Sequence, residues 1–259
     1  MATNNFETVT ELTNSEVSKE QIFRAYSRYN WASKICRDKN VLEVACGAGM
    51  GLGMLFNEAK NLVAGDFTCS IARIAKNHYK DRMPILVFDA QSLPFKDNSF
   101  DVILIVEAIY YISDVDKFFN ECKRVLRSKG KLLIVTANKD LYDFNPSPYS
   151  NSYFGVKEFA DLFHLLQFKV KFYGDVKINS VSFRQRILRP LKWLAVRFNL
   201  IPGSMHGKRI LKRLVFGSPE KMPPELLIES HYNQKPTMIL DKKPNREFKT
   251  LFIEVTMMS

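Results

Sequence analysis

The segment that decides the fold runs from Val41 to Gly51 and reads VLEVACGAGMG, an apolar run that breaks into closely spaced glycines. Glycine has no Cβ, so such a segment can turn sharply and let the backbone approach a bound ligand. The next apolar run ends in Asp66, seventeen residues after Gly49, and the one after it ends in Asp89. An acid at the first of these places can accept hydrogen bonds from a ribose diol. The sequence therefore predicts a pocket for a nucleoside.

Two kinds of nucleoside site begin with a strand that runs into glycines. The dinucleotide fingerprint G-x-G-x-x-G needs its third glycine for close packing of helix against strand. Counted from Gly47 and Gly49, that position is occupied by Leu52, which weakens the prediction of a nicotinamide-dependent oxidoreductase. The sequence has instead an acid, Glu43, four residues before the first glycine, and then G-x-G-x-G.

Further motifs follow the glycines. Residues 88–95 read FDAQSLPF, residues 97–103 read DNSFDVI, residues 124–126 read RVL and residues 130–134 read GKLLI. Together with the glycine segment they resemble the class I, Rossmann-like S-adenosylmethionine-dependent methyltransferases, in particular the small-molecule branch related to ubiquinone-biosynthesis methyltransferases. The resemblance covers roughly residues 40–173. One departure is Ala45, where that family most often has glycine; alanine is small, so we expect the loop to form with a slightly tighter cofactor pocket.

The resemblance implies S-adenosylmethionine as the cofactor and assigns roles around it. Asp66 would hold the ribose hydroxyls, Phe67 would cover a face of the adenine, and Asp89 would accept from the adenine amino group. Glu43 would hold the amides of the loop or the amino group of the cofactor. Each strand-end aspartate has a structural alternative, since it could simply cap the helix that follows. The predicted cofactor-binding residues are Glu43, Ala45, Cys46, Gly47, Gly49, Asp66, Phe67, Asp89, Ala90 and Glu107.

Apolar, β-branched runs alternate with segments of helical periodicity. This alternation predicts a parallel sheet wound with helices on both faces, a Rossmann-like three-layer α/β sandwich that binds its ligand at the carboxyl ends of the strands. Ser18 and Gln21 form a capping box, which predicts a helix from about residue 19 to residue 36. We expect this helix to lie across the cofactor site. The resemblance implies that the last of the seven strands runs antiparallel. The predicted strands are residues 40–45, 62–66, 84–88, 100–106, 131–136, 168–173 and 249–256, and the predicted helices are residues 19–36, 50–59, 69–79, 115–127 and 155–166.

Charge divides the chain into three parts. Residues 176–219 hold 10 Lys and Arg and no Asp or Glu, whereas residues 1–175 hold 22 against 21 and residues 220–259 hold 6 against 6, which adds to the net charge of +11. We expect a cofactor-binding core in residues 1–175, a basic helical insertion or lid in residues 176–245, and the last core strand in residues 246–259.

The basic insertion contains an amphipathic pattern over residues 183–198, with a second basic cluster at residues 208–213. Three uses remain open: a lid whose basic face is solvated, a peripheral contact with an anionic membrane, and binding of the phosphates of a substrate or of RNA. A lipid-phosphate-linked glycan would combine the last two chemistries. From residues 145–149 to residues 212–213 the chain also resembles methyltransferases found among bacterial surface-polysaccharide biosynthesis proteins.

Catalysis of methyl transfer mainly requires that the acceptor atom be placed in line with the methyl group and that water be excluded. A hydroxyl acceptor also needs a base. No single catalytic residue stands out, and no metal site is predicted. The candidates for the base are Glu107, Tyr110, Tyr111, Tyr149, Tyr153, His164, His206 and His231.

Composition agrees with one catalytic domain plus an elaboration, because 259 residues with 46% apolar content can bury one sizeable core. The four cysteines lack C-x-x-C spacing and are predicted to be buried, reduced thiols in a cytoplasmic protein, without a signal or membrane-spanning segment.

The sequence thus predicts S-adenosylmethionine-dependent methyl transfer to a small-molecule, sugar or lipid-linked acceptor. The alternatives are a noncatalytic nucleoside-binding module that attaches to a membrane or partner, and an RNA methyltransferase. The lack of an appended nucleic-acid module disfavours a nucleic-acid partner.

Overall fold

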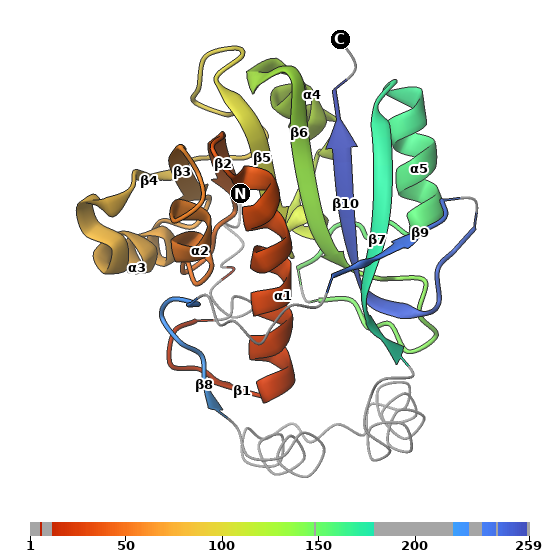
Figure 1. Cartoon of the computed structure of the whole chain (residues 1–259), viewed down its shortest axis with the longest axis horizontal. Coiled ribbons are helices and arrows are strands. Elements are labelled where there is room, and N and C mark those ends of the chain that lie inside the picture. Colours follow the sequence, from red (N-terminus) through yellow and green to blue (C-terminus); the bar gives the residue numbers. More distant parts are fainter. Residues whose placement is uncertain are drawn as a thin grey trace.

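A mixed eight-stranded β-sheet forms the centre of the molecule (Figure 1). The computed structural model describes residues 6, 12–147, 149–178, 220–227, 235–241 and 243–257. The strand order in the sheet is β4-β3-β2-β5-β6-β10-β7-β9. The strands are β2 (Asn40–Val44), β3 (Asn61–Asp66), β4 (Ile85–Val87), β5 (Phe100–Val106), β6 (Leu126–Ala137), β7 (Lys169–Lys177), β9 (Thr237–Ile239) and β10 (Phe248–Thr256).

The direction of the strands follows the expected pattern. The pairs from β4 to β6 are parallel, and β10 runs antiparallel to both β6 and β7. The predicted sheet with an antiparallel last strand is confirmed, but the number of strands is wrong, because β9 adds an eighth at the edge beyond β7. β9 has three residues, too few to show the alternation that marks a strand in a sequence.

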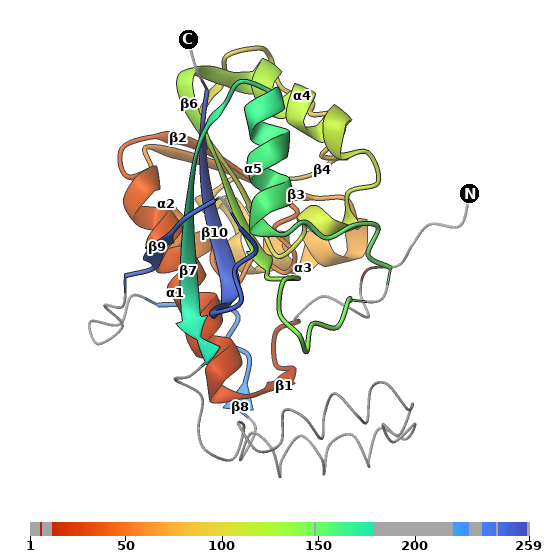
Figure 2. The same ribbon diagram turned by 90° about the vertical axis from the view of Figure 1, so that its right-hand side faces the viewer.

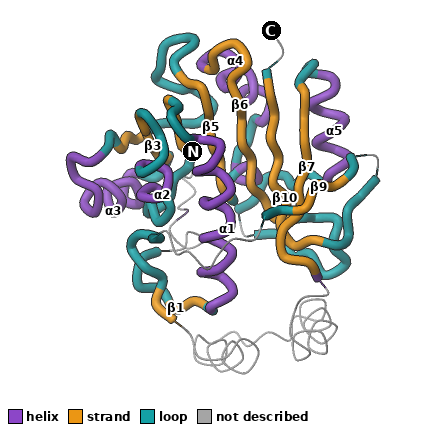
Figure 3. The backbone as a smooth tube through the Cα atoms, viewed as in Figure 1, coloured by secondary structure: helices purple, strands orange, loops and turns teal. Residues whose placement is uncertain are grey.

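Helices alternate with the strands along the chain (Figure 3). The predicted capping box is present at the start of α1, where the Gln21 amide donates to Ser18 Oγ (3.2 Å) and the Ser18 amide donates to Gln21 Oε1 (2.9 Å). α2 is shorter than predicted, because the glycine loop continues to Gly51, and α4 ends where β6 begins at Leu126. The helices are α1 (Lys19–Cys36), α2 (Leu52–Phe56), α3 (Cys69–Tyr79), α4 (Val115–Val125) and α5 (Val156–Leu165), with short 3₁₀ turns at Lys80–Arg82 and Ile109–Tyr111.

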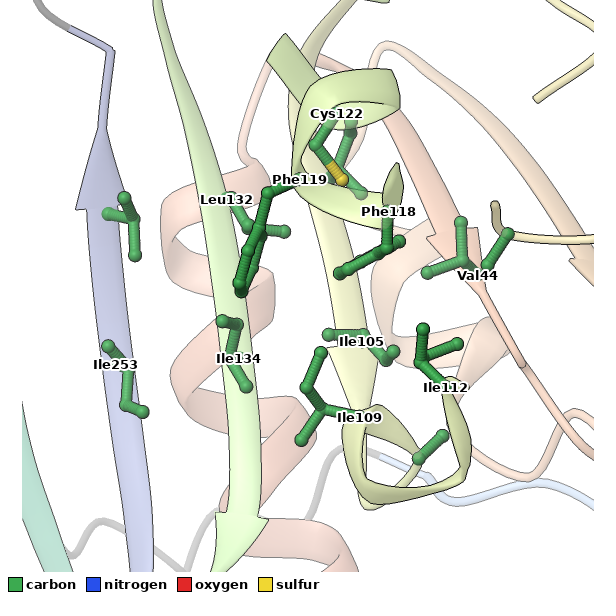
Figure 4. Packing of buried hydrophobic residues seen from close by; sticks show 14 of the residues in the cluster. Val44, Ile105, Ile109, Ile112, Phe118, Phe119, Cys122, Leu132, Ile134 and Ile253 are labelled. Atoms are coloured by element: carbon green, nitrogen blue, oxygen red, sulfur yellow. The ribbon is translucent and has the colours of Figure 1, made fainter. Parts of the chain in front are cut away.

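The helices cover both faces of the sheet and bury two apolar clusters. Figure 2 shows α1 and α2 on one face and α4 and α5 on the other. Successive strand residues point to opposite faces. Ile105 therefore packs in the cluster of α4 and α5, whereas Leu104 beside it packs in the cluster of α1, α2 and α3. In Figure 4, Phe118 and Phe119 of α4 face the strand residues Ile105 and Ile134.

The basic part of the insertion lies outside the described residues, so the helix expected at residues 183–198 and the cluster at residues 208–213 stay predictions. Among the helices that the structure describes, none is both long and apolar enough to cross a membrane.

After this segment the described chain resumes with β8 (Glu220–Lys221), which pairs antiparallel with β1 (Glu16–Val17). The following residues return to the core, where Leu226 is buried and its amide donates to the carbonyl of Met50 at 2.7 Å. The predicted insertion therefore contains segments that pair with other parts of the fold.

Replacement of Phe163 by alanine should lower the free energy of unfolding by about 3–5 kcal/mol, the usual cost of removing a buried aromatic ring. The Phe163 ring is fully buried in α5, with its centroid 5.1 Å from that of Phe119 and 5.8 Å from that of Phe159. Urea denaturation followed by circular dichroism measures the loss. Leu165→Ala, in the same helix but at a side chain that is 80% exposed, should change stability by less than about 0.5 kcal/mol. Equal losses for both variants would contradict the buried face of α5.

Candidate functional site

The loop after β2 turns at three residues with left-handed backbone conformation. Ala45, Gly47 and Gly49 have φ angles of +53°, +59° and +82°. The Cys46 amide donates to the carbonyl of Gly65 in β3 at 3.0 Å, which attaches the loop to the sheet. The loop forms with alanine at position 45, as expected, although a non-glycine residue in this conformation costs about 1–2 kcal/mol.

Gly49 is required by packing. A Cβ at this residue would lie 3.0 Å from the Cβ of Ala75 and 3.1 Å from the ring of Tyr79, both in α3. The Tyr79 hydroxyl also donates to the carbonyl of Gly49 at 2.7 Å. The second glycine therefore lets α3 approach the loop, and its predicted contact with the cofactor stays a prediction.

Asp66 ends β3 and connects that strand end to the glycine loop. Its carboxylate accepts from the Gly47 amide at 3.0 Å and from the Thr68 amide at 2.8 Å. Burial raises the pKa of Asp66, while the two amide hydrogen bonds oppose that change. The structural alternative from the sequence is therefore present in part, since this carboxylate does satisfy backbone amides. It also lines a cavity, where its remaining acceptor capacity is available to a ligand.

The next strand end supplies Asp89 and its neighbours. Asp89 accepts from the Gln91 amide at 2.8 Å and from the Gln91 side chain at 3.0 Å. Ala90 is buried beside it, and Phe67, after β3, is 53% exposed. An aromatic face, a small residue and a carboxylate thus come together at the ends of β3 and β4, an arrangement suited to a planar base with an amino group.

These strand ends surround a cavity of about 710 Å³. The volume lies within the range of about 300–1,000 Å³ that is usual for ligand pockets. The cavity lies where the sequence predicted it, at the carboxyl ends of parallel strands. Eight of the ten predicted cofactor-binding residues line it: Ala45, Cys46, Gly47, Asp66, Phe67, Asp89, Ala90 and Glu107.

Glu43, like Gly49, is not on the wall of the cavity. Its carboxyl is 1% exposed and accepts a hydrogen bond from the Tyr29 hydroxyl at 2.7 Å. Burial raises the pKa of Glu43 to about 8, and the hydrogen bond from Tyr29 opposes this only in part. Its second oxygen, Oε2, has no hydrogen-bond partner among the described residues. Its predicted hold on the loop amides is not observed, and a contact with the cofactor stays a prediction.

Part of the cavity wall comes from α1, the helix that we expected to lie across the site. Ala25, Arg28 and Tyr29 line the cavity. Arg28 Nη2 lies 2.8 Å from Glu107 Oε1, so the helix is joined to the end of β5 across the site. The sequence predicted the helix but not Arg28, because α1 carries several charged residues and only the fold selects the one that faces inward.

Of the proposed bases, Glu107, Tyr110 and Tyr111 line the cavity, together with Ser147 and Asn151, which the sequence did not single out. Burial raises the pKa values of both tyrosines, which keeps their hydroxyls protonated. The Tyr110 hydroxyl donates to Glu107, and the Tyr111 hydroxyl shares a hydrogen bond with that of Ser147. The other candidates, Tyr149, Tyr153 and His164, do not line it, and His206 and His231 lie outside the described residues.

The cysteines are free thiols, but the prediction that all are buried is wrong for Cys69, which is exposed at the first turn of α3. Burial raises the pKa of the Cys46 thiol in the glycine loop, which favours packing over nucleophilic chemistry. In the part of the chain that the structure describes, no group of three or more His, Cys, Asp or Glu residues is arranged to hold a metal ion.

The polar groups at the cavity fit a nucleoside with an amino-acid tail. Asp66 and Asp89 supply acceptors for hydroxyl and amino groups, and Gly47 presents no side chain where a ligand approaches the loop. The orphaned Oε2 of Glu43 lies buried behind the same loop and could accept from an amino group. Parallel strands that end in acids, with a left-handed glycine loop after one of them, are features of Rossmann-like folds that bind a ligand at the carboxyl ends of their strands.

Comparisons with known proteins narrow this class. Residues 42–134 match the family model described as a methyltransferase domain. Over 104 residues the chain is 31% identical to a probable S-adenosylmethionine-dependent methyltransferase of Mycobacterium tuberculosis, covering 40% of this chain and 38% of that protein. Over 207 residues it is 26% identical to the malonyl-[acyl-carrier protein] O-methyltransferase of Legionella pneumophila, covering 74% and 72% of the two chains.

The fold is also similar to that of the YcgJ protein of Bacillus subtilis, with a TM-score of 0.59 and 18% identity over 90% of this chain and 99% of that one. The domain match and the relatives support a class I S-adenosylmethionine-dependent methyltransferase, with S-adenosylmethionine as cofactor. The similar structure supports the fold alone. The chain spans less than half of the length of the mycobacterial relative.

Glu43 should make stability depend on pH. Its pKa is about 8 in the native state, whereas an ordinary glutamate, as in the unfolded chain, has a pKa of 4.5. Between these two pH values the native state therefore binds more protons than the unfolded state. The free energy of unfolding should therefore fall as pH rises from about 4.5 to 8. Glu43→Gln should remove this part of the slope, as measured by urea denaturation at several pH values. Glu247→Gln, at an exposed position, should leave the slope unchanged; a wild-type slope in Glu43→Gln would refute the assignment.

Proposed function

We propose that the protein transfers a methyl group from S-adenosylmethionine to a small-molecule acceptor, with donor and acceptor in one cavity. The observation that carries the proposal is the continuity of this cavity. It extends from Asp66, which ends β3, and Asp89, which follows β4, to a second half lined by Arg28, Glu107 and Tyr111. A donor alone would leave the second half without a role, whereas methyl transfer requires two molecules in contact.

The strand order supports a direction for the bound cofactor. β3 and β4 lie to one side of β2, and β5 and β6 lie to the other. The nucleoside belongs with Asp66 and Asp89, the amino-acid part with the loop after β2, and the acceptor with the residues after β5. The cofactor supplies an activated methyl group, so the protein has to bind and orient both molecules and exclude water.

For the acceptor we infer a hydroxyl-bearing compound such as a sugar, free or lipid-linked. Its half of the cavity combines the rings of Tyr110 and Tyr111 with the hydroxyl of Ser147 and the amide of Asn151. These groups suit a ligand with several hydroxyls. The name of the Legionella relative, an O-methyltransferase, agrees with transfer to oxygen. The basic segment at residues 176–219 supports a phosphate-linked carrier or an anionic membrane surface by its charge.

Turnover separates the enzyme from a noncatalytic module. The purified protein is incubated with methyl-labelled S-adenosylmethionine and fractionated extract of its own source, and S-adenosylhomocysteine and labelled products are measured. The enzyme releases S-adenosylhomocysteine only with an acceptor fraction, and label in a small-molecule or lipid fraction supports the proposal. Binding without release would identify a module, and label in RNA would identify an RNA methyltransferase. If calorimetry shows binding of NADH and not of S-adenosylmethionine, the protein is a nicotinamide-dependent oxidoreductase and the proposal is wrong.

Asp66→Asn should weaken the binding of S-adenosylmethionine by about 1–3 kcal/mol, because a charged acceptor of the ribose hydroxyls is lost. This loss corresponds to about 5- to 150-fold in Kd by calorimetry. Asp116→Asn is the matched control, since Asp116 is exposed on α4 and does not line the cavity. Thermal unfolding tests whether Asp66→Asn is folded despite the change at the Gly47 and Thr68 amides. Wild-type affinity in the folded variant removes Asp66 from the ribose site.

A further inference from the structure

Glu107 follows the end of β5 in a strained backbone conformation. Its φ angle is +51°, and its amide donates to the carbonyl of Val135 in β6 at 2.7 Å. A non-glycine residue in this region costs about 1–3 kcal/mol and persists only where the surroundings enforce it. Here the hydrogen bond to β6 fixes the backbone, and the side chain lines the cavity. The strain thus accompanies the placement of a carboxylate in the acceptor half.

Two side chains orient this carboxylate from different elements. Arg28 Nη2 of α1 lies 2.8 Å from Oε1, and the Tyr110 hydroxyl donates to Oε2 at 3.2 Å. An ionised carboxylate has about four acceptor sites, so each oxygen keeps capacity for one more donor. The Glu107 side chain is 20% exposed and therefore reachable from the cavity. It is oriented and keeps acceptor sites for the hydroxyl of a ligand.

The register of the sheet puts Glu107 beside the glycine loop. Val44 of β2 is the partner of Ile105 of β5. Glu107 follows Ile105 by two residues, as Cys46 follows Val44, and paired strands are about 4.8 Å apart. The backbone of Glu107 therefore lies about one strand spacing from the glycine loop, on the side away from Asp66.

Other groups in the cavity are less suited to accept a proton at this place. Asp66 and Asp89 lie on the nucleoside side, and both already accept from backbone amides. Tyr110 and Tyr111 keep protonated hydroxyls, because burial raises their pKa values. Of the carboxylates among the described lining residues, Glu107 alone lies in the acceptor half.

We propose that Glu107 is the general base of an O-methylation. This inference rests on the proposed function and specifies oxygen as the acceptor atom. An acceptor hydroxyl donates its hydrogen bond to the Glu107 carboxylate while its oxygen faces the methyl carbon. As the new C–O bond forms, the bond from methyl to sulfur breaks, its electron pair returns to sulfur, and the hydroxyl proton passes to Glu107. The products are the methyl ether, S-adenosylhomocysteine and a protonated Glu107, which releases its proton to solvent. Arg28 and Tyr110 are positioning residues.

The placement can be tested without the acceptor, by calorimetry with S-adenosylhomocysteine and sinefungin. Sinefungin carries a protonated amine where the cofactor carries its methyl group, so a carboxylate at that place should bind it in preference. Glu107→Gln should lose at least about 10-fold of the preference for sinefungin over S-adenosylhomocysteine, the usual scale for a charge-assisted hydrogen bond. Asp116→Asn should keep the wild-type ratio, and Asp66→Asn should weaken both ligands alike.

The outcomes separate the two proposals. If neither ligand binds the wild type, the proposed function fails. If both bind and folded Glu107→Gln keeps the wild-type ratio, only the role of Glu107 fails. Glu107→Asp, which keeps the charge on a shorter side chain, should retain part of the preference for sinefungin. Comparison of the two variants therefore separates loss of the charge from general damage to the site.

The reaction itself is followed with [methyl-¹³C]S-adenosylmethionine and source extract, and the ¹³C chemical shift of the product distinguishes O-, N- and C-methyl groups. The expected product is an O-methyl compound, formed about 10²- to 10⁴-fold more slowly by Glu107→Gln at saturating cofactor. A methyl group on nitrogen or carbon, or an unchanged rate in Glu107→Gln, would overturn the inference while leaving methyl transfer intact.

Discussion

The hydrogen bond from the Gly47 amide to the Asp66 carboxylate, 3.0 Å long, joins the ends of two neighbouring strands at the rim of the cavity. Together with the bonds from the Cys46 amide to Gly65 and from the Tyr79 hydroxyl to Gly49, it attaches the glycine loop to β3 and α3 just before α2 begins. The same carboxylate accepts from Thr68 before α3. A strand-end acid that satisfies amides and one that binds a ribose are often treated as alternatives. With about four acceptor sites on a carboxylate and two of them used here, Asp66 can do both.

α1 is the second part of the structure that the cavity requires. Polar side chains of this one helix reach the ends or edges of four strands, so its position is set by directional contacts as well as by apolar packing. A buried polar group that loses its partner costs about 1–3 kcal/mol, which makes any other position of the helix unfavourable. The contacts are Glu20 with Lys249 (2.6 Å), Ser27 with Asp175 (2.7 Å), Arg28 with Glu107 (2.8 Å) and Tyr29 with Glu43 (2.7 Å).

Local patterns in the sequence were enough to predict seven of the eight strands of the central sheet, the helices and most of the cavity wall at the ends of β3 and β4. The glycine loop, Asp66 and Asp89 belong to consecutive strand ends, so their proximity follows from a parallel sheet alone. Arg28, Ser147 and Asn151 could not be found this way, because they reach the cavity from segments far apart in the chain. Glu43 shows the converse problem, a residue that the sequence singled out but the cavity does not include. Its place before the glycines suggested a ligand contact, whereas its burial and its hydrogen bond from Tyr29 depend on how α1 crosses the sheet.

The return of the chain after the basic segment bears on the same cavity. Glu225 contacts Arg82 at 2.8 Å and His78 at 2.9 Å, but these groups are partly exposed, and such pairs contribute about 0–1 kcal/mol. Burial of Leu226 contributes about 1.5–3 kcal/mol and is accompanied by its hydrogen bond to Met50. The attachment therefore depends mainly on Leu226. Met50 lines the cavity, so the segment described after residue 219 contacts the cavity wall through Leu226. A lid, a membrane contact and a phosphate-binding surface would all share this connection, so the attachment itself favours none of them.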